Sequence, residues 1–210
     1  VDENATNGTA VGVTALASDA DATNNVMTYT LDNDAGGRFS IDSNSGVVTV
    51  ADGTLLDRES AASHNITVRA TSNDGSFNSA VMTSNVNDVD EFDVSLVADS
   101  DLTANIVDEN AANGTSVGVT ALATDADATN NTITYSLDDD AGGRFTIDGG
   151  SGVVTVADGT LLDREVSASH DITVRATSTD GSFTNATITI QLNDVDEFDD
   201  GTITDSDSNG

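Results

Sequence analysis

The chain contains no cysteine, no proline, no tryptophan and no lysine. The absence of cysteine excludes a disulfide framework and a thiolate metal site. Its six arginines face 37 Asp and Glu residues, which leaves a formal net charge of −31. Such a surplus disfavours nucleic acid and anionic membranes as partners and favours cations. A salt-adapted acidic surface is the alternative explanation of this charge.

Long apolar runs are also absent. No stretch of 18 apolar residues occurs, so the sequence predicts no membrane insertion by this fragment, and neither end resembles a signal peptide. The motif His-Glu-x-x-His is missing as well. Paired acids alone suit a cation better than a glycosidase, so we expect no enzyme.

The chain consists of two copies of one sequence repeat. Val1-Asp2-Glu3-Asn4 returns as Val107-Asp108-Glu109-Asn110, and the two copies stay in phase without a gap. A repeat of this kind indicates a tandem array, here a window on a longer one. We predict one repeat at residues 1–91, which lacks its leading strand. A second follows at 92–197, with 92–106 as its connector and leading strand, and 198–210 starts the next connector.

Short β-branched segments with apolar residues at alternate positions predict strands. Clear examples are Val26 to Leu31, Val47 to Val50 and Asn65 to Ala70. Turn signals such as Asp52-Gly53 separate them. About seven strands per period is typical of an immunoglobulin-like Greek-key sandwich, so the fold class is all-β with two tandem sandwiches. The predicted inner face of the second copy is Val119, Ala121, Ile133, Tyr135, Leu137, Phe145, Ile147, Val154, Val156, Leu161, Ile172, Val174 and Ala176.

Carboxylates fall into clusters that recur in each copy. In the first copy they are Glu3, Asp19-Ala20-Asp21, Asp57-Arg58-Glu59 and Asp88-Val89-Asp90-Glu91. Acids two residues apart on extended backbone point to one side, as a hard cation with six to eight oxygen ligands requires. For any single cluster the alternative is a solvated acidic turn. The spacing excludes an EF-hand, because Thr30 occupies the position of its bidentate Glu.

These motifs, in this order, resemble the cadherin repeat in its bacterial cadherin-like version. Val107-Asp108-Glu109-Asn110 is similar to the family's x-Pro-Glu-Asn motif, and Ala123-Thr124-Asp125-Ala126-Asp127 to its Ala-x-Asp-x-Asp motif. Leu162-Asp163-Arg164-Glu165 is similar to Leu-Asp-Arg-Glu, and Asp194-Val195-Asp196-Glu197 lies where Asp-x-Asn-Asp-Asn-x-Pro closes the repeat. The resemblance covers essentially both copies.

The resemblance implies the ligands of a calcium site, because in that family these acids bind Ca²⁺ together with the Asp-x-Asp of the next repeat. The implied shared set is Glu3, Asp57, Glu59, Asp88, Asp90 and Glu91 from the first copy, with Asp125, Asp127 and Asn130 from the second. The equivalent set at the end of the second copy is Glu109, Asp163, Glu165, Asp194, Asp196 and Glu197. Asp19 and Asp21 would complete a site with a preceding repeat.

Several positions depart from the family pattern. Proline is absent from the first and last motifs, which removes its fixed φ. Ser72 and Ser178 replace a family ligand, while Asp74 and Asp180 follow two residues later, which favours two ions over three. Asp99 and Asp101, echoed by Asp205 and Asp207, are either an extra ligand pair or a polar loop.

We therefore predict a calcium-binding module of a large bacterial surface or secreted protein, located outside the cell or at its surface. Its role would be to stiffen a repeat array and to support adhesion to cells or surfaces. The expected partners are neighbouring repeats, together with homophilic contacts or a cell-surface polysaccharide. A calcium-dependent polysaccharide-binding module is the alternative, although two Tyr, six Phe and no Trp supply little aromatic surface for it.

Overall fold

The structure is a computed structural model that describes residues 1–21 and 23–196. Its regular elements in these residues are strands and two short 3-10 turns, which confirms the all-β prediction. The chain forms two compact units. Unit 1 comprises Val1–Phe92 and Ala126–Asn130, and unit 2 comprises Asp93–Asp125 and the described residues 131–196. Five residues of the second sequence copy therefore lie in unit 1.

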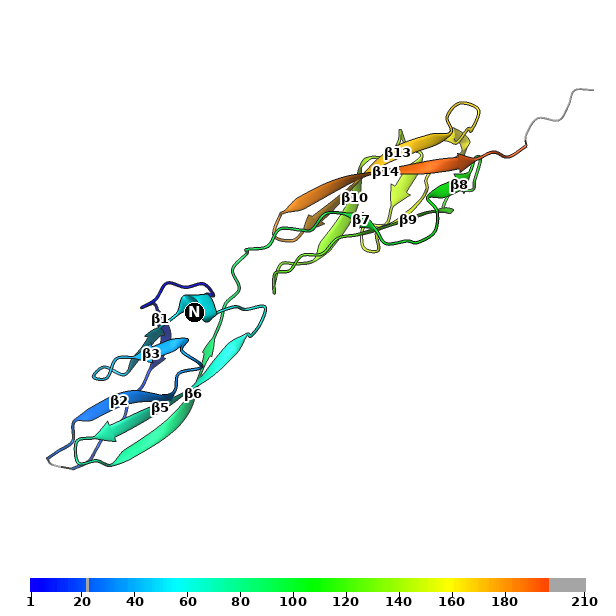
Figure 1. The fold of residues 1–210 in the computed structure, drawn as a ribbon. Helices are drawn as coiled ribbons and strands as arrows, with labels where there is room; N and C mark the ends of the chain where they lie inside the picture. Colours follow the sequence, from blue (N-terminus) through cyan, green and yellow to red (C-terminus); the bar gives the residue numbers. More distant parts are fainter. Residues whose placement is uncertain (22, 197–210) are drawn as a thin grey trace, which may run out of the picture. The chain divides into compact units, whose positions relative to one another are not determined.

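Unit 1 is a sandwich of two three-stranded sheets (Figure 1). One sheet has the order β1-β4-β3 and the other the order β2-β5-β6. All pairings within them are antiparallel. The elements are β1 (Ala10–Thr14), β2 (Met27–Asn33), β3 (Phe39–Ile41), β4 (Val47–Val50), η1 (Gly53–Leu55), β5 (Ser63–Ser72) and β6 (Phe77–Asn85).

Unit 2 has the same plan with one more strand in each sheet. The sheets have the orders β11-β12-β9-β7 and β10-β13-β14-β8, and β8 pairs parallel with β14. The elements are β7 (Ala98–Asp99), β8 (Ile106–Asp108), β9 (Ser116–Leu122), β10 (Ile133–Asp139), β11 (Phe145–Ile147), β12 (Val153–Val156), η2 (Gly159–Leu161), β13 (Ser169–Ser178) and β14 (Phe183–Asn193). Both β7 and the first residue of β8 fall in the predicted leading segment, residues 92–106, and the two strands belong to different sheets. The repeat boundaries read from the sequence stay a prediction.

The alternation in the sequence produces the core directly. In β13, residues Ile172, Val174 and Ala176 point to one face of the pleated strand and are all fully buried. They pack against the inner face of the other sheet, including Val119 and Val154. Tyr135 packs against the core of unit 2, as predicted, and its counterpart Tyr29 lies in the core of unit 1.

One core prediction was wrong. Leu161 is 38% exposed, whereas the neighbouring Leu162 is fully buried. Leu161 is the last residue of the 3-10 turn η2, and Leu162 returns to extended backbone at φ −94°. The turn breaks the period-two alternation, so the buried position moves on by one residue.

Candidate metal centre

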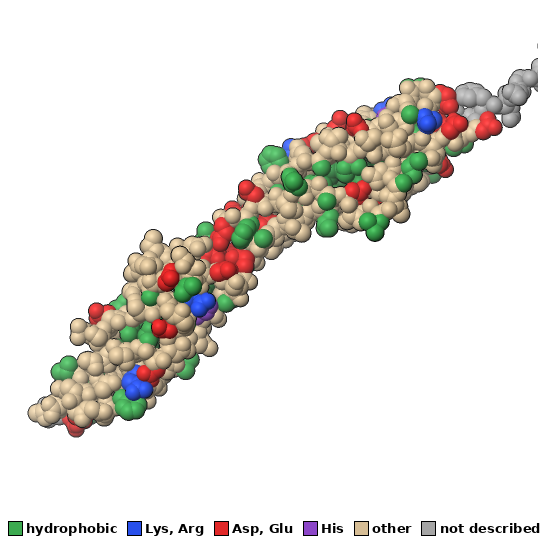
Figure 2. Space-filling view, in the orientation of Figure 1, with side chains coloured by type: hydrophobic (Ala, Val, Ile, Leu, Met, Phe, Trp, Pro, Cys, Tyr) green, Lys and Arg blue, Asp and Glu red, His purple; other side chains and the backbone are tan. Residues whose placement is uncertain are grey.

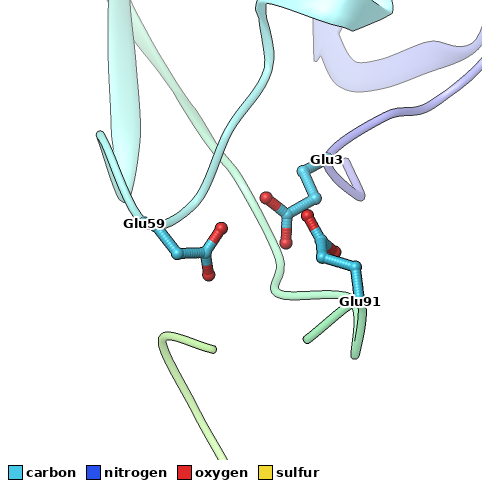
Figure 3. A group of neighbouring side chains, drawn as sticks. All are labelled: Glu3, Glu59 and Glu91. Atoms are coloured by element: carbon cyan, nitrogen blue, oxygen red, sulfur yellow. The ribbon is translucent and has the colours of Figure 1, made fainter. Parts of the chain in front are cut away.

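Within residues 1–21 and 23–196, carboxylates from distant parts of the chain converge in several places, and we name the three that lie within a single unit the acidic groups. In each, three side chains offer oxygen atoms that lie within 4.8 Å of one another. The first acidic group contains Glu3, Glu59 and Glu91, the second Glu109, Asp163 and Glu165, and the third Asp19, Asp21 and Asp74. Figure 3 shows the three side chains of the first group pointing toward one another.

Glu3 lies at the centre of the first acidic group and is only 2% exposed. Its Oε2 accepts a hydrogen bond from the Arg58 backbone N–H at 2.6 Å, and its Oε1 accepts one from the Val89 N–H at 2.8 Å. Asn4 has a φ of 52°, in the left-handed region that Asn tolerates better than most residues. Glu3 therefore ties the two other acidic segments of unit 1 to the start of the chain.

The turn η1 brings the segment with Asp57 and Glu59 against the start of the chain. This close approach needs glycine, since a Cβ on Gly53 would lie 1.8 Å from the Ala5 carbonyl oxygen. Asp57 then accepts hydrogen bonds from the Ser60 N–H at 2.8 Å and from the Ser60 hydroxyl at 2.9 Å. These bonds fix the loop that carries Glu59.

The segment Ala126–Asn130 completes the first acidic group. Its Ala128 N–H donates to Glu59 Oε1 at 2.9 Å, and its Thr129 N–H donates to Asp88 Oδ2 at 2.9 Å. In return, Asp127 Oδ1 accepts from the Glu91 N–H at 3.2 Å. A carboxylate oxygen of Asp90 lies within 4.8 Å of one of Asp127. Asp127 is itself buried. The Asp-x-Asp motif thus contributes its second acid to this group.

Crowding of like charges shifts pKa values in the first acidic group. Burial raises the pKa of Glu91, and repulsion from Glu3, Asp127 and Asp88 adds to this rise. Burial also raises the pKa of Glu59. By contrast, the Thr129 hydroxyl donates to Asp88 and lowers the pKa of that carboxyl. Protons or cations are needed to relieve such repulsion.

The second acidic group repeats this geometry in unit 2. Glu109 is 2% exposed and accepts from the backbone N–H groups of Arg164 and Val195, which lower its pKa. A bond to its own backbone lowers the pKa of Glu165, but burial and repulsion from Glu109 and Asp194 outweigh this and raise it. Asp196 is exposed beyond this group, and Glu197 lies outside the described residues.

The third acidic group lies in unit 1 and contains Asp19 and Asp21. The Tyr29 hydroxyl accepts a hydrogen bond from the Ala17 N–H at 3.0 Å and so anchors the chain two residues before Asp19. Asp74, which the sequence left open, joins Asp19 and Asp21. Its position in an Asp-Gly turn between two adjacent strands was the signal for this placement.

The remaining predicted residues separate by unit. Asp125 belongs to unit 2, where it accepts a hydrogen bond from the Ser178 hydroxyl. Asn130 belongs to unit 1 and has a left-handed φ of 55°. Asp99 accepts from the N–H groups of Asp101 and Thr120, both at 3.0 Å, so it organises its own polar loop. The echo of this pair at 205 and 207 lies outside the described residues.

The donor set fits a hard divalent cation. Carboxylate oxygens converge in each group, and neither cysteine nor histidine is among them. Asp88 Oδ1 and Asp19 Oδ2 are buried and have no hydrogen-bond partner among the described residues. The two ion pairs in that part of the chain, Arg69 with Asp32 and Arg175 with Asp138, involve none of the group members. Figure 2 shows a dense patch of acidic side chains on the visible surface.

Comparison with known families decides what kind of module this is. The model of the cadherin domain matches residues 1–87 and 104–193. The chain belongs to the cadherin domain family. Human protocadherin Fat 1 is 36% identical over 190 residues, which cover 88% of this chain and 4% of that protein. Drosophila dachsous is 34% identical over 196 residues, which cover 87% of this chain and 5% of that protein. The chain thus spans only a small part of these relatives.

Solved cadherin structures share the fold. Mouse cadherin-23 EC22-24 superposes with a TM-score of 0.71 at 29% identity, covering 92% of this chain and 61% of that one. Chicken VE-cadherin EC1-2 gives 0.64 at 25% identity, covering 85% and 89%. These relatives are animal proteins and give no support to the bacterial qualifier or to the polysaccharide alternative. Within the described residues no helix is long and apolar enough to cross a membrane.

Proposed function

We propose that this cadherin repeat pair binds Ca²⁺ at its acidic groups and acts outside the cell as a stiffened adhesive module. The observation that carries the proposal is the first acidic group. There Glu3, Glu59 and Glu91 offer oxygens within 4.8 Å of one another, beside the buried Asp127. The crowding of these negative charges favours a cation that takes many oxygen ligands. The other predicted members, Asp57, Asp88, Asp90 and Asn130, belong to unit 1 as well.

Bound Ca²⁺ would supply positive charge that neutralises the converging carboxylates. Residues 126–130 belong to unit 1, whereas the chain on both sides of them belongs to unit 2. Glu59 and Asp88 already hold this segment through the N–H groups of Ala128 and Thr129. Fixing the segment more firmly therefore restricts the covalent connection between the units. In an array, the same restriction at each junction would stiffen the whole protein.

Adhesion is the role we infer from membership of the family. The partners we propose are neighbouring repeats of the array and homophilic contacts with like molecules. A bead-aggregation assay tests the homophilic part, because beads coated with the chain should aggregate in calcium and disperse in EDTA. Dispersion in both conditions would remove homophilic adhesion from the proposal and leave the calcium-stiffened module.

Stiffening is tested by distances between the units. Since the chain has no cysteine, Val81→Cys in unit 1 and Val166→Cys in unit 2 accept spin labels at exposed positions. We expect a narrow distance distribution in millimolar calcium and a broader one in EDTA. Asp127→Asn should broaden it in calcium as well. Labels at Leu102→Cys and Val166→Cys, both in unit 2, provide the control and should not respond. A distribution between units that ignores calcium would contradict the proposal.

A further inference from the structure

A short turn leads into part of the first acidic group. The 3-10 turn η1 ends at Leu55, and Asp57 and Glu59 follow two and four residues later. Leu56, which comes directly after the turn, is 1% exposed and packs in the core of unit 1. The position of the end of η1 therefore determines where the loop with the two acids begins.

One arginine holds this turn at both ends. The Arg38 carbonyl oxygen accepts hydrogen bonds from the Ala51 N–H at 2.8 Å and the Asp52 N–H at 3.4 Å, just before η1. Its side chain holds the other end, because Nε donates to the Leu55 carbonyl oxygen at 2.9 Å. Nη1 of the same guanidinium donates to the Ala35 carbonyl oxygen at 2.8 Å. Arg38 thus ties η1 to the turn between β2 and β3.

The turn that carries Ala35 has a strained backbone. Ala35 has a φ of 58°, in the left-handed region that non-glycine residues rarely adopt. Strain of this kind persists only where the surrounding structure requires it, and it is concentrated at functional sites. Asn33 Oδ1 accepts a hydrogen bond from the Ala35 N–H at 3.0 Å, while Arg38 holds the carbonyl oxygen of the same residue. The strained turn and the guanidinium therefore support each other.

Unit 2 repeats this arrangement. Arg144 Nε donates to the Leu161 carbonyl oxygen at 3.0 Å, and its Nη1 donates to the Ala141 carbonyl oxygen at 2.6 Å. Ala141 has a φ of 57°. The Arg144 carbonyl oxygen accepts from the N–H groups of Ala157 and Asp158, as its counterpart does in unit 1. Both units thus retain the bridge just before an acidic loop.

The bridging arginine differs from those that pair with acids. In residues 1–21 and 23–196 the ion pairs belong to Arg69 with Asp32 and to Arg175 with Asp138. Arg38 donates to carbonyl oxygens instead. A planar guanidinium suits this task, because its donors lie in a fixed fork. Its contribution here is therefore the geometry of the loop.

We propose that Arg38 is a positioning residue for cation binding by the first acidic group, and that Arg144 has the same role for the second. This role rests on the calcium binding proposed above and adds residues outside the carboxylate set. By fixing the end of η1, the guanidinium determines the path of the loop that carries Asp57 and Glu59. Contacts that orient metal ligands typically change metal affinity by about 10–100-fold when they are removed.

Calcium titrations followed by NMR measure the two acidic groups separately. The Arg58 N–H donates to Glu3 and the Arg164 N–H donates to Glu109, so their amide signals report on the first and the second group. Arg38→Gln should weaken calcium binding at the first group about tenfold and leave the second unchanged. The direction is diagnostic, because the loss of a positive charge would by itself strengthen cation binding.

Matched variants separate geometry from charge. Arg144→Gln should weaken calcium binding only at the second group. Arg69→Gln removes an arginine that pairs with Asp32 and should weaken neither group. Arg38→Lys retains the charge but lacks the fork, so it should weaken the first group as Arg38→Gln does.

Folding of unit 1 is checked in each variant. The amide signals of core residues such as Ile66 should keep their wild-type dispersion. If Arg38→Gln does not fold, it is combined with Ala35→Gly, because glycine adopts a φ of 58° without strain and so stabilises the turn.

Hydrogen exchange in EDTA tests the positioning without metal. A looser loop should speed exchange of the Arg58 N–H in Arg38→Gln and leave the Arg164 N–H unchanged. This measurement separates the two claims. A wild-type chain that binds no calcium would refute the proposed function, whereas unchanged exchange at Arg58 would refute the role of Arg38.

Three binding results would also overturn the role of Arg38. One is calcium binding at the first group that is unchanged or tighter in folded Arg38→Gln. Another is equal weakening at both groups, which would indicate an effect unrelated to the loop of unit 1. The third is wild-type affinity in Arg38→Lys, since the charge alone would then suffice.

Discussion

Replacing Glu59 by Gln separates a metal ligand from a structural residue. The amide has nearly the shape of the carboxylate and retains an oxygen that can accept the Ala128 N–H, which donates to Glu59 at 2.9 Å. It removes one of the converging charges and weakens cation coordination. We therefore expect the sign of its effect on the melting temperature to depend on calcium.

The magnitude follows from linkage. Extracellular calcium modules have dissociation constants of about 10⁻⁴ to 10⁻³ M. At ten times that concentration, each site adds about 1.4 kcal/mol to the free energy of unfolding. For a unit of about 100 residues this raises the melting temperature by roughly 6–11 °C. Magnesium should give a much smaller rise, because it dehydrates reluctantly and demands a stricter geometry.

Differential scanning calorimetry in EDTA, magnesium and calcium measures these shifts. In calcium, Glu59→Gln should melt below the wild type. In EDTA the variant should melt at the wild-type temperature or above it. Burial and neighbouring acids raise the pKa of Glu59, which shows that its negative charge is unfavourable in the folded protein when no cation is bound. The matched control Glu165→Gln changes the second acidic group and should leave hydrogen exchange of residues 126–130 unaltered. Equal destabilisation by Glu59→Gln in all three solutions would refute the reasoning.

Three further expectations follow from the fold. Leu162→Ala should lower the free energy of unfolding by about 2–5 kcal/mol, and exposed Leu161→Ala by far less, as urea denaturation can measure. Tyr135→Phe leaves the Ala123 N–H without its acceptor at 3.0 Å and should cost about 1–3 kcal/mol in the same assay. Burial lowers the folded-state pKa of His170, so the unfolded chain binds its proton more readily. The free energy of unfolding should therefore decrease as the pH is lowered from about 7 to about 5.5. Melting temperatures measured over this pH range should decrease less in the His170→Gln variant than in the wild type.

The sequence predicted the strands well because their signal is local. Alternation in segments such as Ile172 to Ala176 determines which face is buried before any tertiary contact is known. The error at Leu161 came from a 3-10 turn, whose change of period leaves no mark in the hydrophobic pattern. The split of the leading segment into β7 and β8, on opposite sheets, was also not evident, since β7 has only two residues and is defined by its pairing.

The motifs predicted the candidate residues of the site, but not how these residues are distributed between the two units. Recurrent acids at fixed places in the repeat made Glu3 and Glu59 candidates, and the fold brings their carboxylates close together. The separation of Asp125 from Asp127 into different units depends on backbone direction across two residues, which spacing cannot specify. Asp74 joined the third acidic group through a turn whose geometry, and not its sequence distance, decides the contact.

The central claim is that the acidic groups bind calcium, and equilibrium dialysis against labelled calcium tests it most directly. We compare the EDTA-stripped wild type with a variant carrying Glu3→Gln and Glu59→Gln. A charge-matched control carries Asp32→Asn and Asp138→Asn, which lie in the arginine ion pairs. The account predicts saturable binding near 10⁻⁴ to 10⁻³ M, with at least one ion lost from the first variant and none from the control. Equal binding by all three proteins, or no saturable binding by the wild type, would contradict it.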